Sequence, residues 1–365
     1  MQIKEVTACL EQRFPLWLQE DFDNCGVQCG DVSQEVTGVL VCFEMSMQVI
    51  EEAIAQGANL VISHHPLMLK RGICKIQPTD RVGEMICKAL ENKMVLYSMH
   101  TNIDSAQGGG NDAFAEMLGL TDTTVLVPQA GHLRKVVVFV PADHADAMRQ
   151  ALAEIGCGKL GNYDRCAYTM SGTGSFRPNA EANPYIGQAL QEEHVAEERV
   201  EMIFPAPLLR KVIATIYRTH PYEEPAFDIL HLENPSRTEG LGRVGLLPQP
   251  MALPEFLKYL QDKMQIEHIR YAGPTDKLIH KVALCGGGGA SFIEAAMAAG
   301  ADAYVTGDVK YHDFFRSNQS MIIADIGHYE SESFIKEIIY RELKEKFSTF
   351  AVSIAKTDEL KIFYV

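Results

Sequence analysis

The feature that most constrains the fold is a strand–helix–strand pattern that occurs near both ends of the chain. Residues 36–43 form a short apolar run rich in β-branched side chains, and residues 46–56 predict a helix that ends at Gly57. Residues 59–62 predict the next strand. Because strands that alternate with helices are typical of a mostly parallel sheet, the sequence predicts an α/β fold.

The same pattern returns near the C-terminus. Residues 282–306 predict a strand, a turn of four consecutive glycines, a helix and a second strand. When the sequence is slid along itself so that Val39 lies on Val282, the two units align without a gap. We interpret this as a duplicated βαβ half, with two unrelated units of similar composition as the alternative.

The middle of the chain has a different pattern. Strands predicted over 135–140 and 199–204 are each followed by a proline and then a helix. Two βαβ units of this kind form a ferredoxin-like α+β sandwich. We therefore predict that residues 1–128 and 234–365 form one α/β domain, and that residues 129–233 are an insert which splits it.

Composition narrows the class of protein. In 365 residues, 48 acidic side chains outnumber 33 basic ones, which gives a net charge of −15 and argues against passive binding to nucleic acid or an anionic membrane. The nine cysteines include no C-x-x-C pair, so neither a zinc ribbon nor a secreted disulfide framework is expected. No signal peptide or membrane span is evident, and we expect a cytoplasmic protein.

Imidazole and carboxylate side chains follow three predicted strands, where each strand ends. The strands are residues 60–62, 95–97 and 321–324, and the side chains that follow them are His64, His65, His100, Asp104, His328 and Glu332. In open α/β sheets, ligands gather beyond the carboxyl ends of the strands. Side chains more than 200 residues apart could therefore converge on one site.

The spacing of these residues suits metal ions. Adjacent residues that leave a strand point to opposite sides, so His64 and His65 can each serve a different ion. His328 and Glu332 lie four apart on one face of a helix that we expect to continue through Ile339. A carboxylate such as Glu332 or Asp104 could bridge two ions. Mixed imidazole and carboxylate ligands suit zinc, manganese, iron or nickel.

Each motif also has an ordinary structural interpretation. Paired histidines after a strand are often solvated, an i, i+4 His/Glu pair is common on helix surfaces, and Asp104 could serve a turn. Their joint occurrence favours a metal site. The glycines Gly286 to Gly289 could cradle a phosphate with their amides, or simply form a tight turn.

Several segments, in this order, resemble the Nif-three-like family, whose bacterial members are called GTP cyclohydrolase I type 2 homologues. The matching segments are Asp23–Asp31, Ser63–Leu67, His100–Asp104, Thr306–Asp308 and Gly327–Glu332. Residues 219–226 look like the signature of the insert, similar to PII and CutA proteins, that longer bacterial members carry. Residues 23–27 depart mildly from the family's Asp-Asn-x-Gly-Leu, because Val27 replaces the leucine.

The resemblance implies a dinuclear metal site. His64, Asp104 and Glu332 would hold one divalent ion, and His65, His328 and Glu332 the other, with Glu332 as the bridge. His100 would be the catalytic residue that moves protons or orients a ligand, although a structural hydrogen bond is an equal alternative. His312 is a weaker candidate for the same role. Family members are typically ring-shaped homohexamers whose metal sites face an internal cavity.

The resemblance implies a metal-dependent hydrolase of a nucleotide or related heterocycle. In a cyclohydrolase reaction on GTP, hydroxide attacks C8 of the guanine ring and formate leaves. A phosphoester hydrolase with the same metals is the nearest alternative, and a metal-responsive interaction protein without enzymatic activity is the second. We expect the partners to be further copies of the chain and a small-molecule substrate, and a closed ring would exclude duplex nucleic acid.

Overall fold

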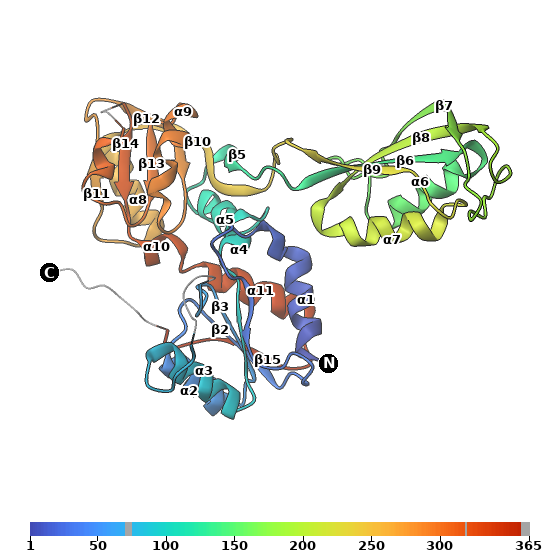
Figure 1. The fold of residues 1–365 in the computed structure, drawn as a ribbon. Helices are drawn as coiled ribbons and strands as arrows, with labels where there is room; N and C mark the ends of the chain where they lie inside the picture. The colour runs from blue at the N-terminus through green and yellow to red at the C-terminus, as the bar shows by residue number, and fades with distance from the viewer. Residues whose placement is uncertain (70–74, 318–319, 359–365) are drawn as a thin grey trace. The chain divides into compact units, whose positions relative to one another are not determined.

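A computed structural model describes residues 1–69, 75–317 and 320–358 (Figure 1). The chain divides into two compact units. The main unit comprises Met1–Gln129 and Ser236–Val365, and the inserted unit comprises Ala130–Pro235. Each unit is described by itself below.

The first sheet of the main unit has the strand order β1-β4-β3-β2-β15. Its strands are β1 (Gly26–Cys29), β2 (Gly38–Cys42), β3 (Leu60–Ser63), β4 (Val95–Ser98) and β15 (Ala351–Ile354). Every pair is parallel except β1 with β4. Strand β15, from the far end of the sequence, therefore completes a sheet that is otherwise built by the first hundred residues.

Helices cover both faces of this sheet. α2 (Met47–Gln56) and α3 (Arg81–Glu91) pack on one face, and α1 (Ile3–Arg13) and α11 (Ile335–Lys346) on the other (Figure 1). Alternate strand residues point to opposite faces, so Leu40 and Val61 join the α2/α3 core while Val41 and Ile62 join the α1/α11 core. Burial on both faces explains why these strands are continuous apolar runs.

The predicted start and end of α2 are confirmed. The Ser46 hydroxyl accepts a hydrogen bond from the Val49 amide, which caps the first turn. Gly57 ends the helix with a φ of 69°, a left-handed conformation that glycine adopts without steric cost.

The second sheet of the main unit is mixed, with the order β11-β14-β13-β12-β10-β5. Its strands are β5 (Thr121–Pro128), β10 (Gly240–Ala252), β11 (Arg270–Ala272), β12 (Leu278–Leu284), β13 (Ala303–Thr306) and β14 (Ile322–Asp325). β12, β13 and β14 are parallel, whereas the three other pairs are antiparallel. The prediction of mostly parallel sheets is thus right for the first sheet and wrong for the second, because β10 pairs antiparallel with both β5 and β12, and β11 pairs antiparallel with β14.

The helix predicted to run from His328 through Ile339 is interrupted, which corrects the sequence analysis. It consists of α10 (His328–Glu332) and α11, which begins at Ile335. Phe334 lies at the break and packs against the hydrophobic cores of both sheets. The chain turns here as it passes from the second sheet back to the first.

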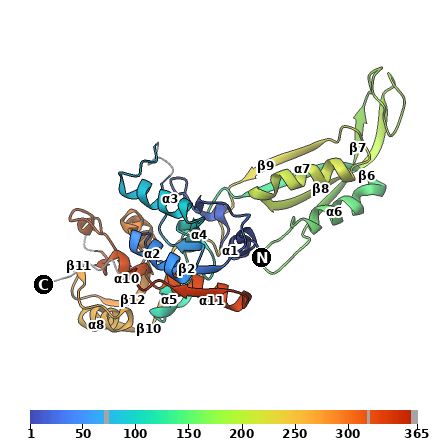
Figure 2. The ribbon, with the colours of Figure 1, turned by 90° about the horizontal axis from the view of Figure 1, so that it is seen from below.

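The inserted unit has the element order β-α-β-β-α-β. Its elements are β6 (Leu133–Pro141), α6 (Ala145–Glu154), β7 (Tyr168–Phe176), β8 (Glu193–Pro205), α7 (Leu209–Thr219) and β9 (Phe227–Leu232). The four strands form an antiparallel sheet in the order β7-β8-β6-β9. Both helices cover the same face of this sheet and enclose its core (Figures 1 and 2).

Two further observations concern the chain as a whole. Eight cysteines lie in the described part of the chain and all are free thiols, while Cys74 lies outside the described residues. Among the described helices, none combines the length and apolar character that crossing a bilayer requires.

Candidate metal centre

Three strand ends of the main unit bring the predicted site residues together. β3 ends just before His64 and His65, and β4 ends just before His100 and the short helix α4 (Thr101–Ser105), which carries Asp104. β14 of the second sheet leads into α10, which begins at His328 and ends at Glu332. The side chains therefore meet where the carboxyl ends of strands from two different sheets face each other, and not at the edge of one sheet.

His64 is fully buried and has a defined tautomer. Its Nδ1 lies 2.8 Å from the Met99 carbonyl oxygen, which can only accept, so Nδ1 carries the proton. Nε2 therefore presents a lone pair. It lies 3.5 Å from Glu332 Oε2 and 3.9 Å from Asp104 Oδ2.

His65 and His328 form a second group with Glu332. Their Nε2 atoms are 3.2 Å apart, and these atoms lie 3.5 and 3.1 Å from Glu332 Oε2. Each ring is held from behind by a carboxylate, because His65 Nδ1 lies 2.6 Å from Glu44 and His328 Nδ1 lies 2.7 Å from Asp308. Both Nε2 atoms thus point at one position beside Glu332.

The sequence analysis missed Glu44 and Asp308. A usable signal existed, since Glu44 lies two residues beyond the end of β2 and Asp308 two residues beyond the end of β13. Both are carboxyl ends of parallel strands, where ligands gather. The same rule that selected the histidines would have selected these two carboxylates.

His100 lies against the two adjacent histidines. Its ring centre is 5.2 Å from those of both His64 and His65, and the three residues offer ligand atoms within 4.8 Å of one another. His100 Nδ1 lies 3.0 Å from Oδ1 of the buried Asp23. Hydrogen bonds from His100 and Thr101 outweigh the effect of burial and hold the pKa of Asp23 below its ordinary value.

The described part of the chain contains three groups of His, Asp and Glu side chains that could hold a metal ion. They are His64, His65 and His100; His65, His328 and Glu332; and His64, Asp104 and Glu332. His312 belongs to none of them. Its ring is exposed and contacts Tyr311 edge-on at a centroid distance of 5.2 Å.

The four-glycine turn makes room for Glu332. A Cβ atom at Gly287, where φ is 61°, would lie 2.2 Å from Glu332 Oε1. The amides of Gly286, Gly287 and Gly289 donate to the side chains of Asn111, Ser331 and Thr306. Because these three amides already have internal partners, the tight-turn interpretation is favoured over a phosphate cradle.

Protonation in the metal-free chain differs sharply within the cluster. Burial lowers the pKa of His64 to about 4, so this imidazole is neutral. Burial also opposes the charge on His65, but Glu332 and Glu44 outweigh it and raise the pKa of His65 to about 10. The Glu332 carboxylate, 3.1 Å from Nε2, raises the pKa of His328 to about 9.

The two carboxylates of the cluster shift in opposite directions. Burial and the charge of Glu332 raise the pKa of Asp104, whereas the histidine rings beside Glu332, above all His328 at 3.1 Å, outweigh burial and lower the pKa of Glu332. Glu332 is therefore the carboxylate that stays ionised.

A pair of buried atoms tests whether these residues fit a metal. His64 Nε2 and Glu332 Oε2 both lie without a hydrogen-bond partner in the described structure. A neutral imidazole lone pair thus faces a carboxylate oxygen at 3.5 Å with no proton between them. Two such electron pairs repel, and a cation bound by both removes the conflict, so the donor set fits a metal ion.

A cavity of about 670 Å³ opens beside the His65 and His328 pair. Three aromatic rings, two cationic side chains and four carboxylates contribute to its lining: Phe43, Tyr311, Tyr329, Arg270, Lys310, Glu44, Asp308, Asp325 and Glu330. Arg270 is paired with Asp325 at 2.9 Å. The cavity is large enough for a small organic ligand that touches the candidate metal position.

Comparison with known proteins identifies the family. Residues 1–361 match the family model Duf34/NIF3 (NGG1p interacting factor 3). A Bacillus subtilis protein named GTP cyclohydrolase 1 type 2 homolog is 37% identical over 342 residues, which cover 93% of this chain and 91% of that protein.

Solved structures agree with this match. A Bacillus cereus protein related to NIF3 superposes with a TM-score of 0.82 at 35% identity, over 100% of this chain and 99% of that one. The Staphylococcus aureus protein SA1388 superposes with a TM-score of 0.79 at 27% identity and the same coverage. By sequence and by fold, the chain belongs to the Duf34/NIF3 family.

Proposed function

We propose that the chain holds two divalent metal ions and uses them to hydrolyse a nucleotide or a related heterocycle. His64, Asp104 and Glu332 would bind one ion, and His65, His328 and Glu332 the other. The observation that carries the proposal is the buried lone-pair conflict between His64 Nε2 and Glu332 Oε2, which a cation would resolve. When bound, such ions supply Lewis acidity and make water a stronger acid.

The residues behind the ligands prepare them for this task. The Met99 carbonyl oxygen, Glu44 and Asp308 each engage an Nδ1 atom and so direct an Nε2 lone pair toward the centre. Such partners orient imidazole ligands and raise their basicity. Glu332 is buried at the end of α10, with the Nε2 atoms of three histidines within 3.5 Å of one oxygen, which suits a bridging carboxylate.

His100 is proposed to hold or transfer a proton at Nε2. Asp23 accepts a hydrogen bond from Nδ1–H and thereby fixes the ring and its tautomer. The ring is near enough to His64 and His65 to reach a substrate bound beside the metals. A general acid or base needs this combination of reach and orientation.

The cavity beside His65 and His328 supports a small and flat substrate. Its volume of about 670 Å³ lies in the usual range for small-molecule sites, about 300–1,000 Å³. Tyr311 and Tyr329 offer aromatic faces. Four carboxylates outnumber the cations Arg270 and Lys310 in the lining, so an anionic substrate would depend on the bound ions for its attraction. GTP is the first substrate to test because curated relatives carry the name GTP cyclohydrolase 1 type 2 homolog.

Three further expectations belong to this proposal. The strand order β7-β8-β6-β9 in the inserted unit supports a ferredoxin-like insert similar to PII and CutA proteins, and the domain bounds 1–128, 129–233 and 234–365 remain a prediction. We also propose that the chain assembles as a homohexamer around its metal sites. Its place of action is proposed to be the cytoplasm.

The test combines metal analysis with product identification. Purified protein is analysed for zinc, manganese, iron and nickel, loaded with each, and incubated with GTP and other nucleotides. Formate release that is lost in Asp104→Asn and kept in Asp122→Asn, an exposed position on β5, would support the proposal. Phosphate without formate would favour the phosphoester hydrolase. Bound metal without turnover of any nucleotide would favour the interaction protein.

A further inference from the structure

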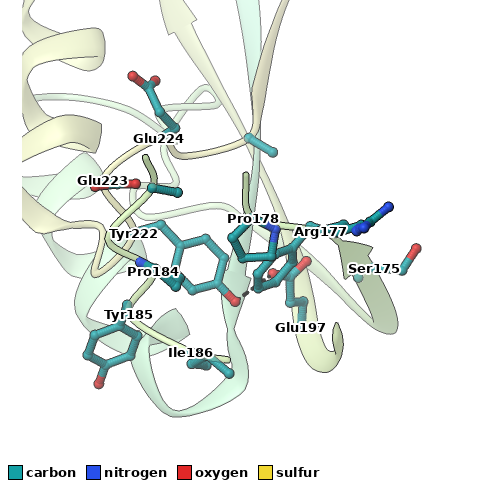
Figure 3. A pocket seen from close by; sticks show the side chains of 14 residues that line it. Ser175, Arg177, Pro178, Pro184, Tyr185, Ile186, Glu197, Tyr222, Glu223 and Glu224 are labelled. Carbon is teal, nitrogen blue, oxygen red and sulfur yellow. Dashed lines mark hydrogen bonds between the residues drawn. The ribbon is translucent and has the colours of Figure 1, made fainter. Parts of the chain in front are cut away.

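The inserted unit contains a cavity of about 300 Å³ that the proposed function does not use (Figure 3). It lies between the loop that joins β7 to β8 and residues 220–226, part of the signature segment singled out in the sequence. Tyr222 stands at its centre, with Pro178, Pro184 and Glu197 around the ring (Figure 3).

The position of Tyr222 is fixed by a buried histidine. His220 donates from Nε2 to the Phe139 carbonyl oxygen at 2.8 Å, and its Nδ1 accepts the Tyr222 amide at 3.0 Å. The Tyr222 hydroxyl then donates to Glu197 Oε1 at 3.0 Å. On the opposite side, the Asn183 amide donates to Glu223 at 3.0 Å and ties the β7–β8 loop to the segment. The cavity therefore has walls held in place by specific hydrogen bonds.

The carboxylate of Glu197 has room beside the neighbouring strand because that strand carries a glycine, Gly174, at this point. A Cβ atom at Gly174 of β7 would lie 2.1 Å from Glu197 Oε2. The absence of that atom leaves space for the carboxylate. A second cavity, of about 390 Å³, shares both Gly174 and Glu197 with the first. One carboxylate oxygen accepts from Tyr222, the other lies against Gly174, and the carboxylate lines both cavities.

The charge around the cavity is negative. Glu197, Glu223 and Glu224 line it together with a single cation, Arg177. Figure 3 shows the Arg177 side chain extending away from Tyr222, and its Nε donates to the Leu190 carbonyl oxygen at 3.1 Å. Aromatic faces carry negative potential and attract cations, and a half-buried carboxylate does so more strongly.

We propose that this cavity binds a small organic cation, an ammonium group on an aromatic or short apolar body. The ammonium pairs with Glu197 over the ring of Tyr222. The apolar body occupies the space between Pro178 and Pro184. This binding site is separate from the candidate metal centre in its residues and in its chemistry.

The test compares two probes of equal size on the full-length protein by calorimetry. Tyramine carries the ammonium group, and 4-propylphenol replaces it with a methyl group. We expect tyramine to bind more tightly, and Glu197→Gln to weaken tyramine about tenfold or more while leaving 4-propylphenol unchanged. Glu201→Gln is the matched control, because Glu201 lies on the same strand, outside the cavity, paired with Lys135.

A second variant keeps the proposal testable if Glu197→Gln destabilises the unit. Tyr222→Leu retains apolar bulk but removes the aromatic face, and we expect it to weaken tyramine relative to 4-propylphenol. Thermal melting shows that each variant is folded. Equal binding of the two probes by the unmodified protein would overturn the proposal. So would an unchanged tyramine affinity in Glu197→Gln, which would place the amine elsewhere, including at the metals.

Discussion

At the scale of single residues, substitution of Glu332 is expected to reduce metal binding more than substitution of any other ligand, because Glu332 belongs to both proposed ligand triads. One oxygen lies within 3.5 Å of His64, His65 and His328. We expect Glu332→Ala to lose both ions, as measured by elemental analysis of the purified protein. Glu337→Ala, at an exposed position on α11, should keep them. Unchanged metal content in Glu332→Ala would reject the bridging role.

The histidine pair predicts a proton-linked metal affinity. The pKa of His65 is raised to about 10 and that of His328 to about 9, so in metal-free protein both rings are charged near neutral pH. A metal needs the neutral rings and must displace these protons. Affinity should therefore rise with pH up to the range of 9 to 10.

Calorimetric titrations of the metal in two buffers with different ionisation enthalpies check this expectation. The apparent enthalpies should differ, because the buffer takes up the released protons, and they should differ less in His328→Ala. Equal enthalpies in the two buffers would show that the rings are already neutral before the metal binds.

Residue types and spacing were sufficient to predict which side chains meet in the cluster, but not how each is oriented. His64, His65, Asp104, His328 and Glu332 converge as the strand-end rule predicts. The tautomers depend on Met99, Glu44 and Asp308, which come from neighbouring turns. The strand-end rule could have placed Glu44 and Asp308 near the cluster, but it does not say which ring nitrogen each carboxylate engages.

At the scale of elements, the segment after β15 holds the turn that carries Glu44, next to the candidate metal centre. The Asp358 carboxylate is buried and accepts hydrogen bonds from the Phe43 and Glu44 amides, and Lys336 Nζ lies 3.2 Å from it. Glu44 in turn holds His65. A residue near the C-terminal end thus positions a proposed ligand near the N-terminal end.

We expect Asp358→Ala to lower the free energy of unfolding by about 2 kcal/mol, since it leaves two amides and a lysine without their partner. It should also speed metal loss, because Glu44 is no longer held behind His65. Denaturant unfolding and the rate of metal transfer to a chelator measure the two effects. Lys356→Ala, an exposed neighbour, should change neither. An unchanged rate of metal release in Asp358→Ala would contradict this role of the segment after β15.

Elements with local signals were predictable, and elements that depend on distant pairing were not. The cap at Ser46 and the stop at Gly57 identify α2 because both act within one helical turn. β15 was missed because its partner β2 lies about three hundred residues earlier. The break before α11 was missed for a related reason, since Phe334 packs on two cores that the sequence does not distinguish.

At the scale of the whole molecule, the inserted unit should be removable. The Gln129 amide donates to the Glu239 carbonyl oxygen at 2.9 Å, and the Ser236 amide donates to the Gln129 carbonyl oxygen at 2.7 Å. The two ends of the insertion are thus already adjacent in the main unit. We expect a chain with residues 130–235 replaced by a short glycine linker to fold and to bind the same metals. A molten or metal-free product would show that the main unit depends on the insert.

The net charge of the whole chain makes nucleotide binding depend on the metal ions. The chain carries −15 and should repel a nucleotide. The two ligand carboxylates offset only about half the charge of two divalent ions, so the loaded centre is positive. We expect GTP to bind the loaded protein at least about tenfold more tightly than the metal-free protein, and guanosine, which lacks the phosphates, to gain less.

Calorimetry on the two forms measures these affinities, and light scattering gives their mass in solution. In a hexameric ring the mass should be about six times that of one chain in the loaded form, and the enclosed sites should admit nucleotides but not duplex DNA. Equal GTP affinity with and without metal would show that the ions do not attract the nucleotide electrostatically. A monomeric mass at micromolar concentration would show that no closed ring forms and that the sites are not enclosed. The proposal of the metal site itself would stand, because all five proposed ligands come from one chain.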